Sequence, residues 1–372
     1  MPIRTSVLLA VAVLSAMNLR AAELDSALAK VAAVGPQGKG NAEAASAWKE
    51  LAAASAADIP TLLAAIDSDN PLAANYIRSA VDSIVQRDGT KLPASAIAAF
   101  VKDTSNDPRA RRFAFELLSE AHPDVGSAML DSMLHDPSVE IRRDAVAAKI
   151  NQAERIEIKP QSIEVYQAAF DAAVDDDQVK AISKALKDLG QEVDIARHYG
   201  FIMNWHIIGP FDNADEAGFD KPRGPEGEAV DLTASYQGSH DEGEVKWQEA
   251  SSDDNYGKID LNAALGKHKS AIAYAAATFD AAEARPVQLR WKSKNAGKVW
   301  LNGRLIDQRE VYHSDGGPAL DQYISTGQLR KGTNTFLVKI CQNDQDQPWA
   351  QSWAFQLRVC DSVGAAVLAN ND

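Results

Sequence analysis

The residues best suited to chemistry lie in loops of the second half of the chain. The stretch NDQDQPWAQSW sets Trp349 in a polar loop close to Asn343 and Asp344. An indole face can stack on a sugar ring while amide and carboxylate groups bond the sugar hydroxyls, which is what a glycan site needs. We therefore predict a ligand site formed by Trp349, Asn343 and Asp344. Trp353 falls in a strand pattern, and we place it in the core.

A second loop, DNADEAGFD, concentrates acidic side chains around one glycine. Oxygen-rich loops of this kind bind Ca²⁺, so Asp212, Asp215 and Asp220 form a candidate metal site. Their spacing does not follow the EF-hand pattern, and a solvated acidic loop is the simpler interpretation. The sequence points to no other cofactor.

The search for catalytic motifs is negative. The sequence contains no G-x-S-x-G, H-E-x-x-H or C-x-x-C motif. Ser239, His240 and Asp241 are adjacent, but a catalytic triad needs groups that converge in space, so a polar turn explains them better. We predict no catalytic residue and a protein that is not an enzyme. A glycan-active enzyme whose Asp and Glu residues converge only in the folded chain is the open alternative.

Length and charge restrict the classes of partner. At 372 residues the chain exceeds the usual size of one domain. The formal net charge of −14 opposes binding to nucleic acid or to an anionic membrane. We therefore expect two folded domains and no nucleic-acid partner.

The first residues have the layout of a signal peptide. Arg4 precedes an apolar run from Val7 to Met17, and two alanines follow before an acidic stretch. The apolar run is short for a membrane span. We predict that residues 1–22 are a signal peptide and that the mature protein is secreted or periplasmic, without a membrane span. An uncleaved membrane anchor is the alternative.

The composition changes near the middle of the chain. The first half is rich in alanine with helical periodicity, whereas the second half has alternating apolar patterns, glycine turns and six of the seven tryptophans. The expected fold class is therefore α + β in separate domains. The predicted parts are a helical domain at 23–190, a linker at 191–203, an antiparallel β-sandwich at 204–362 and a C-terminal tail at 363–372.

A recurring pattern runs through the helical half. NPLAANYIRSAV, DPRARRFAFELL, DPSVEIRRDAVAAK and DQVKAISKAL each begin with a turn and continue with small apolar residues at helical spacing. The matching positions are Ile77, Ala110, Ile141 and Val179, and their intervals of 31 to 38 residues suit a helix pair. This half resembles the HEAT-repeat family of α-solenoids. The resemblance implies an extended surface for a protein partner, and a spacer or clamp is the alternative.

The turns of this pattern carry polar signals. Asp107 and Asp136, each followed by proline, predict N-caps with proline in the first helical turn. Arg111 and Arg142 recur at equivalent positions. Such arginines either form a basic ladder for an acidic partner or, more commonly, bond to the Asp of the next turn.

The second half contains strand patterns. FIMNWHIIGPF predicts a first strand that buries Trp205 and ends at Gly209-Pro210. Later strands are predicted in IAYAAATF, VQLRWKSK, KVWLNGRLI, NTFLVKIC and WAFQLRV, which suits a β-sandwich of jelly-roll type. Asn302-Gly303 is the commonest signal for a two-residue hairpin turn.

A series of motifs in this half carries a family resemblance. W-x-x-x-G-P-F at 205–211 is followed by G-F-D at 218–220, P-E at 225–226 and V-D-L at 230–232. The series resembles a module of exported bacterial proteins that occurs beside repeat or peptidase-like domains. VWLNGRLI and LRKGTNTFLVKI are similar to strand pairs of galactose-binding-like jelly rolls, including sugar-binding domains of glycoside hydrolases. The resemblance spans about 205–360 and implies that fold with a glycan as candidate ligand.

Two cysteines are present in a chain expected to be exported. If the strands that carry them form a hairpin, Cys341 faces the start of the second strand and lies roughly 24 Å from Cys360, at ~3.4 Å per residue. We therefore expect two free cysteines.

Together these patterns predict a non-catalytic, exported binding or scaffolding protein. The solenoid would contact a protein, and the β-sandwich would bind a glycan. The alternative function is an accessory subunit or member of a carbohydrate-active enzyme system.

Overall fold

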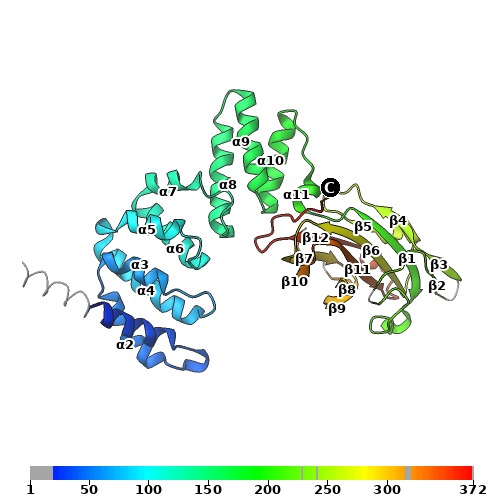
Figure 1. The fold of residues 1–372 in the computed structure, drawn as a ribbon, viewed down its shortest axis with the longest axis horizontal. Helices are drawn as coiled ribbons and strands as arrows, with labels where there is room; N and C mark the ends of the chain where they lie inside the picture. The colour runs from blue at the N-terminus through cyan, green and yellow to red at the C-terminus, as the bar shows by residue number, and fades with distance from the viewer. Residues whose placement is uncertain (1–19, 228, 240–241, 315–319, 371–372) are drawn as a thin grey trace, which may run out of the picture. The chain divides into compact units, whose positions relative to one another are not determined.

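The computed structural model describes residues 20–227, 229–239, 242–314 and 320–370; positions 1–19 of the predicted signal peptide lie outside this range. The chain divides into two units, Met1–Ile156 and Glu157–Asp372. Among the described residues, helices make up the first unit and all strands lie in the second (Figure 1). The predicted helical N-terminal region and antiparallel, strand-rich C-terminal region are confirmed. No helix in the described range is both long and apolar enough to cross a membrane.

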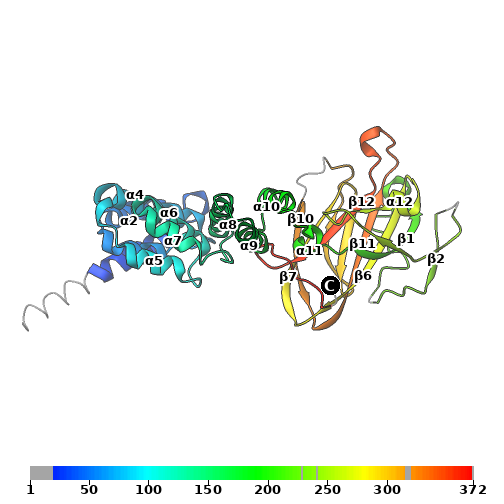
Figure 2. The ribbon, with the colours of Figure 1, turned by 90° about the horizontal axis from the view of Figure 1, so that it is seen from above.

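The first unit is a succession of helices (Figure 2). They share one core made mainly of alanine and aliphatic side chains. Its helices are residues 20–32, α2 (Asn41–Ala52), α3 (Ile59–Ala64), α4 (Pro71–Asp88), α5 (Ala94–Lys102), α6 (Pro108–Ala121), α7 (Pro123–Leu130) and α8 (Val139–Glu154). The predicted equivalent positions Ile77, Ala110 and Ile141 lie in α4, α6 and α8, and each is at most 1% exposed. The recurring pattern therefore marks the buried face of alternate helices.

The turn before α6 follows the predicted chemistry. The Asp107 carboxylate accepts hydrogen bonds from the amides of Arg109 and Ala110 at 2.8 and 3.0 Å, as an N-cap should. It also accepts one from the amide of Ser68, in the turn before α4, at 3.0 Å. Burial raises the pKa of Asp107, but these hydrogen bonds outweigh it and hold the pKa below its usual value. One side chain thus caps α6 and ties it to the turn before α4.

The prediction for Asp136 was wrong in detail. Helix α8 begins at Val139 with Ser138 at the N-cap position, and Asp136 accepts a hydrogen bond from the Ser138 amide at 2.8 Å. Its two oxygens also accept from both terminal nitrogens of Arg111, at 2.8 and 2.6 Å, in a pair whose side chains are 1% and 5% exposed. Arg111 therefore bonds to the Asp of the next turn, as in the second of the two predicted arrangements, and takes no part in a surface ladder.

The second unit opens with helices α9 (Lys159–Ala172), α10 (Asp176–Asp188) and α11 (Ile195–Tyr199). Val179, the fourth predicted repeat position, is fully buried in α10. Asp176 accepts hydrogen bonds from the hydroxyls of Tyr199 and Tyr256 at 3.0 and 2.8 Å, and from Lys180 at 2.7 Å. Because Tyr256 follows β4, this carboxylate joins α10 to the sheet-bearing part of the unit.

The strands form two larger sheets and a small one, and every pairing is antiparallel. The six-stranded sheet has the order β4-β1-β6-β11-β8-β9, the four-stranded sheet β10-β7-β12-β5, and β2 pairs with β3. Their bounds are β1 (Asn204–Asp212), β2 (Ser235–Gln237), β3 (Glu244–Lys246), β4 (Gln248–Ser251), β5 (Ile259–Asp260), β6 (Ala271–Ala281), β7 (Arg285–Ser293), β8 (Ala296–Leu301), β9 (Arg304–Arg309), β10 (Tyr323–Leu329), β11 (Gly332–Gln342) and β12 (Ala354–Cys360). A short helix, α12 (Leu261–Leu265), follows β5.

The two larger sheets share one core. Trp205 of β1 packs with Trp291 of β7 and Leu357 of β12, and its ring meets Phe355 edge-on at 5.0 Å. Trp353 is fully buried in the same core, as predicted. Because side chains alternate along a strand, the opposite side of β1 faces away from this core.

The outer side of the six-stranded sheet is partly covered by the chain that follows β1. Ile208 and Phe211 of β1 pack there with Phe219 from the following loop and with Tyr274 of β6. The expectation that β1 ends at Gly209-Pro210 was wrong: β1 continues to Asp212, and its register against β6 shifts between Ile208 and Phe211. The two residues form an irregularity inside the strand.

Two further local predictions can be compared with the structure. Asn302 and Gly303 connect β8 to β9 with φ values of 53° and 79°, as the predicted two-residue turn requires. Cys341 and Cys360 are both free and buried. The hairpin assumed for their strands was wrong, because β11 and β12 belong to different sheets.

Candidate functional site

The predicted ligand residues lie in the connection between β11 and β12. Trp349 sits in a short 3-10 helix, Pro348–Ala350, and is 58% exposed. Asp344 is also exposed, whereas Asn343 is buried. The Trp349 ring meets the His313 ring edge-on, with 5.3 Å between centroids. The contact leaves most of the indole open to solvent.

Polar contacts link His313 of this aromatic pair to Asn343 and then to Glu216. His313 Nε2 lies 2.5 Å from Asn343 Oδ1, and Asn343 Nδ2 donates to Glu216 Oε1 at 2.9 Å. Since the Asn343 amide nitrogen is the donor to Glu216, its oxygen is the acceptor and His313 donates. Three loops, after β1, β9 and β11, therefore meet at Asn343.

His313 was not predicted from the sequence, and Glu216 lies in the acidic DNADEAGFD loop but was not among its predicted site residues. The two residues are 97 positions apart in the sequence. Both adopt left-handed backbone conformations, with φ of 52° and 59°. Such conformations in residues other than glycine carry strain and cluster at functional sites, but they become visible only in the folded chain.

The buried side-chain amide of Asn213 holds together the loops that carry Glu216, His313 and Asn343. Asn213, fully buried, accepts from the Gly218 amide at 3.0 Å and donates to the Gln342 carbonyl at 3.0 Å and the Tyr312 hydroxyl at 3.2 Å. Burial raises the pKa of Tyr312 above its usual value, so the phenol stays protonated. These bonds give Asn213 a structural role.

One buried amide oxygen near the site has no partner in the described residues. Asn295 is 1% exposed and donates from Nδ2 to Gln342 Oε1 at 2.6 Å, while its Oδ1 accepts nothing. Gln342 Nε2 in turn donates to the Ala350 carbonyl, next to Trp349, at 3.1 Å. An unpartnered buried acceptor costs free energy unless water or a ligand group supplies a donor.

Basic side chains pair with two of the acidic residues in the loop after β1. Asp220 lies 3.0 Å from Lys298 Nζ, and Asp212 lies 3.6 Å from Arg223. Asp215 is exposed. No three His, Cys, Asp or Glu side chains in the described range form a group that could hold a metal ion. The structure therefore does not bring Asp212, Asp215 and Asp220 together as the predicted Ca²⁺ site requires.

Lys339 of β11 makes three hydrogen bonds to the chain that follows β1. Its side chain is fully buried, and Nζ donates to the carbonyls of Phe219 and Lys221 at 3.0 and 3.1 Å and to Glu226 Oε1 at 2.7 Å. The Tyr274 hydroxyl donates to the same Glu226 oxygen at 2.5 Å. The G-F-D and P-E motifs of the sequence thus supply the groups that fasten this loop to the sheet.

Comparison with known proteins adds little to this geometry. No protein-family model matches the sequence, and no curated protein matches it. A β-glucosidase from Kluyveromyces marxianus in complex with glucose aligns at 14% identity over 48% of this chain and 21% of that chain, with a TM-score of 0.27. A β-glucuronidase from an uncultured Clostridium sp. aligns at 12% identity over 44% of this chain and 29% of that chain, with a TM-score of 0.21. The chain spans less than a third of the length of either enzyme, and a likeness this weak decides neither fold nor activity.

The site offers an open aromatic face with amide, imidazole and carboxylate groups behind it. Of the three predicted ligand residues, Trp349 and Asn343 are linked through His313, and Asp344 adjoins them in the chain. The Ser239-His240-Asp241 stretch lies in part outside the described residues. The arrangement is suited to binding a polyhydroxylated ligand through stacking and hydrogen bonds.

Proposed function

We propose that this protein is an exported, non-catalytic binding protein whose sheet-bearing half, of galactose-binding-like jelly-roll type, binds a glycan through Trp349. The helical half, a HEAT-like α-solenoid, holds a protein partner. The observation that carries the proposal is the exposed indole of Trp349 backed by His313 and Asn343.

The geometry around Trp349 favours a binding site over a packing role. Large aromatic side chains usually lie buried, and the other tryptophan of the same connection, Trp353, is fully buried. Stacking on Trp349 would leave Glu216, Asp344 and the His313 ring within the same loop cluster for hydroxyl groups of a sugar. Since most of these groups are acidic or neutral, a neutral glycan suits the site better than an anionic one.

Features of the first unit support the solenoid part of the proposal. Asn70 Nδ2 donates to the carbonyls of Ala32 and Val34 at 3.1 and 3.2 Å, and the Ser68 amide donates to Asp107. Arg111 bonds to Asp136. Each of these bonds joins one inter-helix turn to the preceding or following helix pair, as expected for stacked repeats.

A glycan array with the full-length protein tests the glycan part. We expect the wild type to bind at least one neutral oligosaccharide and Trp349→Ala to weaken that binding at least tenfold, because the stacking of the indole on the sugar face is lost. Ile324→Ala is the matched control, since Ile324 is a large apolar residue that is 48% exposed on β10 of the four-stranded sheet. Circular dichroism of both variants confirms that they fold.

Three outcomes would overturn the glycan part. They are an array without any bound glycan, equal binding by wild type and Trp349→Ala, and equal loss in both variants. Binding should persist in EDTA, because Asp220 is already bonded to Lys298. Release of reducing sugar from a bound glycan would replace the binding function with a hydrolytic one.

Photo-crosslinking of the full-length protein in envelope fractions tests the protein partner. Leu72 and Val139 are 43% and 45% exposed at the starts of α4 and α8. A photoreactive residue at either position should capture one discrete partner, and a photoreactive residue at Ile324 should not. Capture of nothing, or of the same products from all three positions, would contradict a solenoid contact.

A further inference from the structure

Strained backbone conformations gather in the loops around Asn343. Among the described residues other than glycine, seven have a positive φ, and four of these lie next to Asn343 in space, with φ between 48° and 59°: Asp215, Glu216, Ser270 and His313. The Ser270 amide donates to the Asn343 carbonyl at 2.9 Å, which adds a fourth segment to the three loops that meet there. Such strain costs free energy and clusters at functional sites, so it marks the same loops that surround Trp349.

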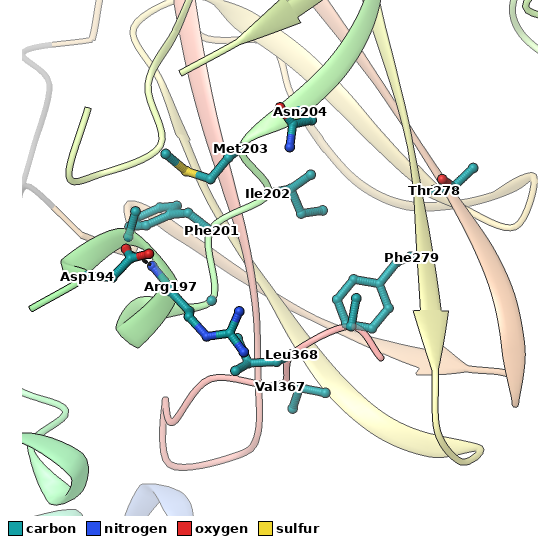
Figure 3. A pocket seen from close by; sticks show the side chains of 13 residues that line it. Asp194, Arg197, Phe201, Ile202, Met203, Asn204, Thr278, Phe279, Val367 and Leu368 are labelled. Atoms are coloured by element: carbon teal, nitrogen blue, oxygen red, sulfur yellow. Dashed lines mark hydrogen bonds between the residues drawn. The ribbon is translucent and has the colours of Figure 1, made fainter. Parts of the chain in front are cut away.

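A separate hollow of about 240 Å³ lies between α11, the C-terminal segment and the end of β6 (Figure 3). Its apolar walls are Ile202, Phe279 and Val367, which belong to the core between the two larger sheets or pack against it. None of the seven strained residues lines this hollow. It therefore lies at the margin of the core and shares no residue with the loops at Asn343.

Glu216 presents a carboxylate in the loops at Asn343. Its Oε1 accepts the hydrogen bond from Asn343 Nδ2, and its side chain makes no other hydrogen bond or ion pair within the described part of the chain. Glu216 is exposed, and a carboxylate offers about four lone-pair sites. Most of its capacity to accept hydrogen bonds is therefore available to a ligand.

A short series of contacts joins this carboxylate to the indole of Trp349. The contacts are 2.9 Å from Glu216 to Asn343, 2.5 Å from Asn343 to His313 and 5.3 Å between the rings of His313 and Trp349. Asn343 is buried and bonded on both sides, so it fixes the carboxylate relative to the imidazole. One oligosaccharide can cover both the indole and the carboxylate.

The charges around Trp349 favour an uncharged ligand. Lys269 Nζ donates to the carbonyl of Ala350, the residue after Trp349, at 2.9 Å. Its ammonium group disfavours a cationic sugar, and the carboxylates of Glu216 and Asp344 disfavour an anionic one. The groups of an uncharged sugar that can donate hydrogen bonds to a carboxylate are its hydroxyls.

We propose that Glu216 determines the specificity of the site by accepting hydrogen bonds from a vicinal diol of a neutral glycan, a role that rests on the glycan function proposed above. The two hydroxyls of a vicinal diol lie on adjacent ring carbons, so both can donate to one carboxylate. Hydrogen bonds to an ionised acceptor are short and strong. A sugar whose diol is blocked would desolvate the carboxylate without replacing its hydrogen bonds. Asn343 is the positioning residue, because its amide holds the carboxylate in place.

Calorimetric titration of the full-length protein with cellohexaose, mannohexaose and galactohexaose tests this role. Each sugar is used unmodified, O-methylated at O-2 and O-3, and O-methylated at O-6 only. Methylation at O-2 and O-3 removes both donors of the vicinal diol, whereas methylation at O-6 adds bulk and leaves the diol intact. We expect the wild type to bind an unmodified hexaose and its O-6 derivative, and to bind the derivative without the diol at least tenfold more weakly.

Matched variants assign the preference for the diol to Glu216. Glu216→Gln keeps an oxygen for Asn343 and loses the charged acceptor, so the preference should fall below about threefold. Asn343→Asp keeps an acceptor for His313 and removes the donor to Glu216, so the preference should fall there too. The control is Asp215→Asn, which removes a negative charge from the exposed neighbouring residue and should keep the full preference.

Failure of this role differs from failure of the glycan function. The role of Glu216 is overturned if the wild type binds all three forms equally, if Glu216→Gln keeps the preference, or if Asp215→Asn also loses it, while Trp349→Ala still weakens binding. Tighter binding of a glucosamine hexaose than of any neutral hexaose would overturn it as well. Binding of no unmodified hexaose, or equal binding by Trp349→Ala and the wild type, would overturn the glycan function itself.

Discussion

The two lysines that hold the acidic loop allow a controlled test of how burial determines the strength of an ion pair. Lys298 and Lys339 are direct neighbours on β8 and β11 and point to the same side of the sheet. Lys339 is fully buried with Glu226 at 15% exposure, whereas Lys298 pairs with Asp220, which is 81% exposed. The perturbation is Lys→Met at each position, which removes the charge and keeps an unbranched side chain that is one atom shorter.

The expected losses differ because the partners differ. Lys339→Met removes two hydrogen bonds to carbonyls and one to a carboxylate, and it leaves the Glu226 charge with only the Tyr274 hydroxyl. Breaking a buried pair costs about 3–5 kcal/mol, and we take about 3 kcal/mol because Glu226 keeps one partner. Lys298→Met should cost less than about 1 kcal/mol, because its partner Asp220 is 81% exposed although the Lys298 side chain itself is only 10% exposed.

Urea unfolding and calorimetry of the full-length protein measure the difference. At 2–4 °C per kcal/mol for a unit of this size, Lys339→Met should lower the Tm of the sheet-bearing unit by roughly 6–12 °C, against less than about 4 °C for Lys298→Met. In a double-mutant cycle, Lys339→Met and Glu226→Gln should couple by about 1–3 kcal/mol. Equal losses in the two Lys→Met variants, or a loss below about 1 kcal/mol for Lys339→Met, would refute the reasoning.

Three other predictions follow from buried polar groups. Arg111→Ala should destabilise the first unit by about 3–5 kcal/mol in urea unfolding, because it leaves the buried Asp136 carboxylate without its charged partner. The double variant with Asp136→Leu should recover part of that loss. Burial raises the pKa of Asp321, but hydrogen bonds and charge from Arg358 and Arg290 outweigh burial and hold the pKa below its usual value. The ionised carboxylate therefore stabilises the folded protein above about pH 4, and this stabilisation is lost as pH falls further. The variant Asp321→Asn should show a shallower loss of stability between pH 5 and pH 2. Burial raises the pKa of the Cys341 thiol to about 12, so the native protein should resist a thiol reagent at pH 8 there and react only in denaturant; fast labelling of Cys341 would contradict its burial.

The fold was predictable where the signal is local. Alternating apolar residues marked β6, β7, β11 and β12, and Asn302-Gly303 marked a turn, because strand period and turn conformation depend on neighbouring residues. The pairing of strands was not local. Cys341 and Cys360 were placed on one hairpin, since nothing in the intervening loop shows that the chain crosses from one sheet to the other.

The candidate site was predictable only in part for the same reason. Trp349 and Asn343 share one polar loop, so they could be named together, whereas His313 and Glu216 reach Asn343 from loops far away in the sequence. The sequence did contain a signal for the buried Lys339–Glu226 pair, and this signal was not used in the prediction. In KVWL and VKIC, lysine stands at positions that alternate with core residues, and such a lysine on a covered outer face requires an acidic partner from the covering segment.

The carboxylate of Asp176 has a consequence for where this chain can be cut. Composition changes after α10, yet Asp176 is bonded to Tyr256, and Arg358, which is 1% exposed, donates to the Tyr199 carbonyl at 3.1 Å. A gene fragment that starts at Asn204 would lack both groups and would leave the Arg358 guanidinium short of an acceptor. A fragment that starts at Glu157 keeps them, so limited proteolysis of the intact protein should yield a stable piece with its new amino terminus before α9 rather than after α11.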